Sequence, residues 1–159
     1  MAKTSLKEIK HKRDGGGGAV LIVPHCVLNS AAYLTLSGRA IKLLYDIAMQ
    51  YNTYNNGALL ASWRYMNEKR GWTSSDALAK AKVELLEREL IVQTVQGQLP
   101  NKASWYGITW LALDNIKGLE ISAAHWPRGI YARWQPTTPQ SKRKAPLNIK
   151  SCLVRTSDT

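Results

Sequence analysis

Cysteine and histidine are scarce in this chain of 159 residues, and their positions exclude several kinds of site. The two cysteines, Cys26 and Cys152, lie far apart, so the sequence predicts no disulfide framework. The three histidines are scattered, and none pairs with a cysteine at zinc-ligand spacing. We therefore expect no metal site and no cofactor. The adjacent pair His25-Cys26 is interpreted as structural, because catalytic Cys/His pairs are usually assembled from distant segments.

Long apolar runs are also missing. The first 18 residues, MAKTSLKEIKHKRDGGGG, are polar and end in four glycines, unlike the apolar centre of a signal peptide. No stretch has the length and apolar character of a membrane span. The sequence therefore predicts a cytoplasmic protein that does not contact a membrane.

The common catalytic motifs are absent. The sequence contains no paired carboxylates, no metal-ligand spacing and no nucleophile elbow. Gly15–Gly18 are followed by neither the lysine nor the helix of a phosphate-binding loop, so they are interpreted as a linker. We expect no enzymatic activity.

Acidic residues are outnumbered by basic ones, and the excess lies mainly at the ends. The chain has 22 Lys/Arg against 11 Asp/Glu, a net charge of +11. Residues 1–18 carry +3, residues 19–114 carry +2 and residues 115–159 carry +6. This division predicts a nearly neutral folded domain over 19–114 between two basic arms that are attracted to a polyanion such as nucleic acid. Solubility alone is the alternative explanation of the arms.

The first half of the predicted domain contains one strand-like run and one clear helix. AVLIVP, residues 19–24, is an apolar run of strand length that a proline closes. From Ser37, a favoured N-cap, apolar residues recur at helical spacing, which leaves Arg39, Lys42 and Asp46 largely outside. The turn YNTYNNG ends this helix.

The second half has the order of a winged helix. Ser62 can cap a short helix, WRYMNEKR, that ends at Gly71, and Thr73 or Ser74 can cap the next helix. Two helices joined by a short turn with glycine are typical of a helix-turn-helix. LIVQTVQ and ASWYGITWLALD then read as two strands around a turn at residues 97–102. We predict an α+β winged helix-turn-helix, with a three-helix body and a β-hairpin wing.

This fold predicts where DNA contacts lie. The second helix of a helix-turn-helix enters the major groove, and its N-terminal residues reach base edges while nearby groups hold phosphates. The acids Glu84, Glu87 and Glu89 then belong to the far end of that helix. The predicted contacts are Thr73, Ser74, Ser75, Lys80 and Lys82 on the second helix, Arg64, Lys69 and Arg70 on the first, and Gln98, Asn101 and Lys102 at the hairpin turn. An ordinary cap, a solvated helix face and a plain turn are the alternative interpretations.

The regular spacing of apolar residues ends after Asp114, and prolines and basic residues dominate the segment that follows. We expect an extended arm there rather than a second core. The predicted phosphate contacts of the arm are Arg128, Arg133, Lys142, Arg143 and Lys144. The aromatics Trp126, Tyr131 and Trp134 are costly to leave in water, so we expect them to dock on the body, on a second subunit or on a protein partner.

Three stretches carry a resemblance to a known family. They are AYLTLSGRAIKLLYDIAMQYNTYNNGALLAS, MNEKRGWTSSDALAKAKVELLERELIVQTVQG and NKASWYGITW. Over residues 25–113 the chain resembles the bacterial winged helix-turn-helix proteins of plasmids, prophages and integrative elements, and is similar to the winged-helix part of some replication initiators. Members of this family often carry glycine where this chain has Glu89. The resemblance implies DNA binding.

We therefore expect a sequence-selective double-stranded DNA-binding protein, a transcriptional regulator of a bacterial mobile element. Such modules usually dimerise to read two half-sites, so a homodimer is expected. An accessory factor in plasmid or phage replication, partition or transfer is the alternative with the same chemistry. A winged-helix adaptor that binds protein is the alternative of another class.

Overall fold

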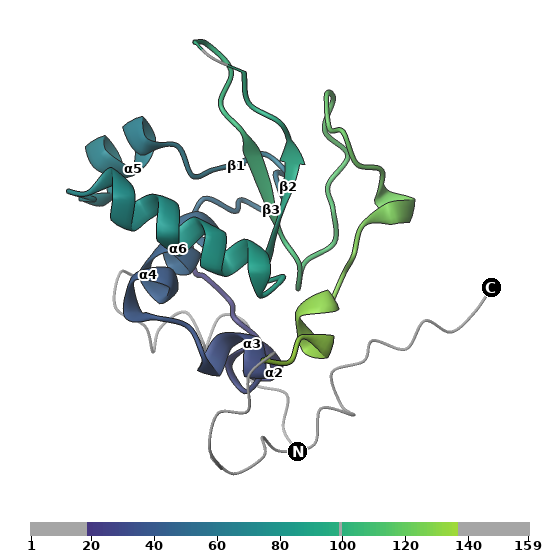
Figure 1. The fold of residues 1–159 in the computed structure, drawn as a ribbon. Coiled ribbons are helices and arrows are strands. Elements are labelled where there is room, and N and C mark those ends of the chain that lie inside the picture. Colours follow the sequence, from purple (N-terminus) through teal and green to yellow (C-terminus); the bar gives the residue numbers. More distant parts are fainter. Residues whose placement is uncertain (1–18, 99, 137–159) are drawn as a thin grey trace.

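A computed structural model describes residues 19–98 and 100–136, and Figure 1 shows the arrangement of their helices and strands. The chain forms a mixed α+β fold. The elements in chain order are α2 (His25–Leu28), α3 (Ala31–Leu34), α4 (Gly38–Ala48), β1 (Leu59–Leu60), α5 (Trp63–Arg70), α6 (Ser75–Glu87), β2 (Ile91–Val95), β3 (Trp105–Ile108) and the short 3-10 helices η1 (Ala123–His125) and η2 (Ile130–Arg133).

Serine hydroxyls begin the three longer helices. Ser37, Ser62 and Ser74 each accept a hydrogen bond from the backbone N–H three residues further on. A cap of this kind satisfies one of the N–H groups that the first turn leaves without a partner. The predicted caps of α4 and α5 are confirmed, and of the two candidates for α6 the structure selects Ser74 over Thr73.

The core lies where α4 packs against α6. Leu43, Leu44 and Ile47 of α4 are buried, as are Leu78 and Leu85 of α6. These side chains recur at three- and four-residue steps, so each helix places one apolar face in the interior. In the sequence, the spacing of Leu78, Ala81 and Leu85 predicts an inward face for this helix, and the structure confirms it, because all three are buried.

A small antiparallel sheet covers the other side of the core. Its strand order is β1-β3-β2, with Leu59 opposite Tyr106 and Ile91 opposite Ile108. Strands β2 and β3 form the predicted hairpin, and β1 adds a short third strand. The sequence of helix, strand, two helices and hairpin is compatible with a winged helix.

The run at residues 19–24 does not form the strand that its composition predicts. These residues belong to no helix or strand. The exposed fractions of Val20, Leu21 and Ile22 are 52, 38 and 72%. A strand requires a neighbouring strand to pair with, and within the described residues none lies beside this run.

Residues 115–136 pack on the body instead of extending from it. Trp126 and Tyr131 are buried, and Trp134 packs against the core. The indole of Trp126 lies so close to Gly107 that an added Cβ there would come within 2.6 Å of it, and its Nε1 donates to the Leu111 carbonyl at 2.9 Å. The sequence left three docking sites open for these aromatics, and the structure shows that they dock on the body. The folded domain therefore extends beyond Asp114, where the sequence predicted its boundary.

Candidate nucleic-acid interface

The first turns of α6 present polar side chains to solvent. Thr73, Ser75, Asp76 and Lys80 are exposed, whereas the opposite face of the same turns is buried. Ser74 is exposed as well, but its hydroxyl is engaged in the helix cap. In Figure 1, α6 crosses the front of the molecule with α5 at its N-terminal end and the β2–β3 hairpin rising above it.

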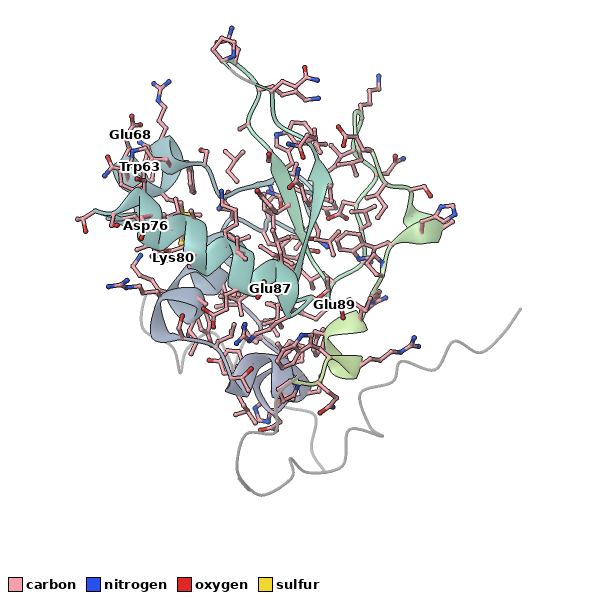
Figure 2. The ribbon with its side chains drawn as sticks, viewed as in Figure 1. Trp63, Glu68, Asp76, Lys80, Glu87 and Glu89 are labelled. Carbon is pink, nitrogen blue, oxygen red and sulfur yellow. The ribbon has the colours of Figure 1, made fainter. Side chains whose placement is uncertain are left out.

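Charge is divided along α6 as the sequence predicts. Figure 2 shows Asp76 and Lys80 at the end near α5, and Glu87 and Glu89 at the opposite end. The Lys80 ammonium lies 2.8 Å from the Asp76 carboxylate, and the two side chains are 76 and 73% exposed. An ion pair this exposed is worth little, so Lys80 remains available to an anionic ligand.

Lys82 is placed differently from Lys80. Its side chain is half-buried, and its Nζ lies 5.8 Å from the centre of the Tyr106 ring on β3. Burial lowers the pKa of Lys82 because a charged ammonium is harder to solvate there. Lys82 therefore lies between α6 and the base of the hairpin rather than on the outermost face of the helix.

Arg70 is committed to an internal partner. Its Nε and Nη2 donate to the Asp46 carboxylate at 2.9 and 2.8 Å. The sequence predicted that Arg70 contacts the DNA backbone and that Asp46 lies on the outer side of α4. Instead, Asp46 is only 4% exposed, because Arg70 and its neighbours cover it.

Two further donors complete the Asp46 site. The Trp72 indole N–H donates to the carboxylate at 2.8 Å and the Lys42 ammonium at 2.6 Å. Burial alone would raise the pKa of Asp46, but the hydrogen bonds from Lys42, Trp72 and Arg70 outweigh it and lower the pKa. Together these bonds fix the turn at Gly71, which has the left-handed φ of 68° and ends α5.

The other two predicted cations of α5 face solvent. Arg64 is 87% exposed and pairs with Glu68 at 3.3 Å. Lys69 is exposed and makes no ion pair within the described part of the chain. Both lie on the helix that adjoins the N-terminal end of α6, so they can reach the same ligand as Lys80.

The hairpin tip carries the third predicted group. Gln98, Asn101 and Lys102 are exposed. The backbones of Gln98 and Lys102 exchange hydrogen bonds of 2.9 and 2.8 Å across the turn, which holds these side chains at the tip. The structure thus places exposed members of all three predicted groups on α6, α5 and the hairpin.

A second loop beside the hairpin was not predicted. The segment between β3 and η1 rises next to the hairpin in Figure 1. The Glu120 N–H donates to the Thr94 carbonyl at 2.9 Å and fastens this segment to β2. Its turn at Lys117 and Gly118 presents an exposed lysine, and Gly118 has a φ of 88°. In the sequence, this turn is indicated by Gly118, which directly follows Lys117.

Arg39 was also missed as a candidate contact. It lines an open groove with Lys80 between the start of α4 and α6. Across this groove the backbone N–H and hydroxyl of Ser37 each donate to the Glu84 carboxylate at 2.7 Å. No sequence signal reveals this neighbour of Lys80, because it depends on how α4 packs on α6.

The predicted arm contacts divide into two groups. Arg128 and Arg133 are exposed on the segment that packs on the body, whereas Lys142, Arg143 and Lys144 lie outside the described residues. The described residues contain no cluster of side chains suited to a metal ion and no helix long and apolar enough to cross a bilayer. Comparison with protein-family models, with curated proteins and with solved structures finds no match for this chain.

Proposed function

We propose that this chain is a winged-helix protein that binds double-stranded DNA in a sequence-selective way. The observation that carries the proposal is the exposed polar face at the start of α6, which follows a tight glycine turn and lies beside the hairpin. A helix held in this way can enter the major groove with its N-terminal residues against base edges.

The side chains divide between two roles in this proposal. Thr73, Ser75 and Lys80 face the bases, because Thr73 is exposed just before α6 and the other two are exposed on its first turns. The outer cations hold phosphates on either side; they are Arg39, Arg64, Lys69, Lys102 and Lys117. Arg70 positions α6 through Asp46 instead of touching DNA.

We propose that the chain regulates transcription on a bacterial mobile element. It acts in the cytoplasm and without catalysis. Direct reading of bases by a short helix gives the discrimination between sites that a regulator requires. The described residues carry 12 Lys/Arg and 8 Asp/Glu, a modest net charge of +4. The body alone therefore supplies limited attraction to phosphates, and base contacts account for its selectivity.

Selection of duplexes from a random pool tests the proposal. The full chain is incubated with the pool at several salt concentrations, and bound DNA is sequenced. We expect one enriched motif and binding that weakens steeply as salt rises. Lys80→Ala should reduce affinity for that motif roughly 5- to 100-fold.

Arg133, which the sequence predicts as a phosphate contact of the arm, lies on η2 and is not among the cations assigned to phosphates above. Arg133→Ala is therefore the matched control. It removes one positive charge from η2, which lies at the C-terminal end of α6, where the Arg88 guanidinium stacks on Trp134. We expect affinity close to that of the unaltered chain. Absence of any enriched motif would overturn the proposal in favour of a protein adaptor or nonspecific coating of DNA, and equal losses in both variants would reject the assignment of α6.

A further inference from the structure

Residues 19–23 form an apolar surface that the proposed function does not use. Val20 and Ile22 are 52 and 72% exposed, whereas Leu21 between them is 38% exposed and Val23 packs against the core. This alternation matches the two-residue period of a strand, with Leu21 and Val23 toward the body. Val20 and Ile22 then form an exposed aliphatic pair on one face, which is less favourable than a single exposed side chain.

The backbone of this segment is unpartnered as well. No backbone hydrogen bond joins Ala19–Val23 to another described residue. Figure 1 shows the segment as a length of chain without helix or strand that leads into α2. β-branched residues and leucine without a pairing partner are a template for strand addition.

We propose that Ala19–Val23 pairs as an antiparallel strand with the same segment of a second copy of this chain. The pairing is centred on Leu21. Leu21 then lies opposite Leu21, and Val20 of each copy lies opposite Ile22 of the other. Every cross-strand pair is apolar, so the segment is complementary to itself, as a two-fold interface requires.

Charge permits a second copy to approach at this segment. The chain carries +11, and two copies repel each other wherever charged faces meet. The ten residues from Gly15 to Pro24 contain no charged side chain. Antiparallel pairing also sends the two basic segments 1–13 in opposite directions, whereas parallel pairing would place them side by side.

The paired strands would be attached firmly to their bodies. Val23 packs against the core and Val27 of α2 is fully buried, so the strand cannot rotate freely about the domain. A two-stranded ribbon alone is marginally stable. We therefore expect a reversible dimer whose population rises with protein concentration.

Sedimentation velocity of the full chain over a concentration series tests this inference without DNA, so its outcome is independent of the proposed function. We expect a mass that rises from 17.8 kDa toward twice that value. Val20→Asp should raise the dimer dissociation constant about ten-fold, because each copy then places an aspartate, which strands disfavour, opposite Ile22 of the other copy. Val83→Asp is the matched control, since Val83 is also a valine and is 53% exposed on α6.

A second pair of variants tests the register. In a chain with Cys26→Ser and Cys152→Ser, Leu21→Cys should form a disulfide between copies on mild oxidation, because residues directly opposite have Cβ atoms about 4.5–5.5 Å apart. Ile22→Cys should cross-link more slowly. In this register Ile22 of one copy lies opposite Val20 of the other, so the two Ile22 residues are only diagonal neighbours.

Three results would overturn the inference. The first is a chain that remains monomeric at all concentrations. The second is a dimer that Val20→Asp and Val83→Asp weaken equally, which would place the interface elsewhere. The third is a monomer in which hydrogen exchange shows protected amides at residues 20–23, which would mean that the chain covers this segment itself.

Discussion

At the scale of single residues, Asp46 organises the connection between α5 and α6. It accepts hydrogen bonds from Arg70, Trp72 and Lys42 and is almost fully buried. Asp46→Asn should lower the free energy of unfolding by about 2–3 kcal/mol at pH 7, less than for a fully buried pair because Lys42 is half-exposed. Urea unfolding followed by tryptophan fluorescence measures the change.

Asp76→Asn provides the comparison for Asp46→Asn. Asp76 also pairs with a lysine four residues away, but both side chains are about three-quarters exposed. An exposed pair contributes little, so we expect a loss below about 0.5 kcal/mol. Equal losses in the two variants would show that the Asp46 site does not fix the turn.

The stability that Asp46 contributes depends on pH in a defined direction. Its pKa in the folded chain is lowered relative to the unfolded chain, so the folded state favours the carboxylate. The contribution is therefore complete above the unfolded pKa of about 3.9 and is lost as pH falls through the lower folded pKa. The difference in unfolding free energy between the unaltered chain and Asp46→Asn should stay constant from pH 7 to 5 and become smaller below about pH 4. A difference that grows on acidification would contradict this reasoning.

At the scale of elements, α6 ends in a conformation that favours glycine. Glu89 has a φ of 57°, and the N–H groups of Glu89 and Leu90 donate to the carbonyls of Leu86 and Leu85 at 3.1 and 3.2 Å. This pair of bonds is the Schellman motif, in which glycine usually takes the left-handed position. Glu89 therefore occupies a position where a residue with a side chain is strained.

Glu89→Gly should stabilise the chain by roughly 0.5–1 kcal/mol, because glycine adopts a positive φ without strain. Glu87→Gly, two residues earlier and still within α6, should destabilise it by about 0.5 kcal/mol through lost helix propensity. Thermal unfolding of both variants gives the two signs. A loss of stability in Glu89→Gly would mean that the Glu89 side chain contributes more than its backbone strain costs.

Most helices and strands could be predicted from the sequence, because their signals lie within a few residues of one another. The features that were missed depend on contacts with residues distant in the sequence. The serine caps, Gly71 and the inward stripe of α6 involve residues a few positions apart, so the sequence predicts them well. Residues 19–24 have the composition of a strand, but pairing requires a neighbour that composition does not specify. Helical spacing placed Asp46 on an outer face, yet it carries no information about the turn that covers this face.

At the scale of the whole molecule, the main difference from expectation is the extent of the folded body. Residues 115–136 show no periodic apolar pattern, because isolated aromatic anchors fasten them instead of a continuous helical or strand face. Trp126 lies against Gly107, and the Tyr131 hydroxyl lies 3.6 Å from the Cys26 thiol. These contacts join residues that are far apart in the sequence, so a short sequence window cannot reveal them.

Two truncations test this extended boundary. Removal of residues 137–159 should leave cooperative thermal unfolding intact, because the packed aromatics remain. Removal of residues 115–159 also deletes Trp126 and Tyr131, and loss of one large buried aromatic typically costs about 3–5 kcal/mol. We expect the shorter chain to lose cooperative unfolding in circular dichroism, and a transition equal to that of the longer one would show that residues 115–136 do not support the fold.

The longer truncated chain also separates the tail from the body in DNA binding. Residues 137–159 hold five Lys/Arg and one Asp, so their removal should reduce the slope of log affinity against log salt by about 0.9 for each phosphate that the tail cations neutralise in the full chain. The enriched motif should stay the same, because Thr73, Ser75 and Lys80 at the start of α6 are retained. A changed motif would assign base reading to the tail, whereas an unchanged slope would show that the tail cations do not bind phosphates.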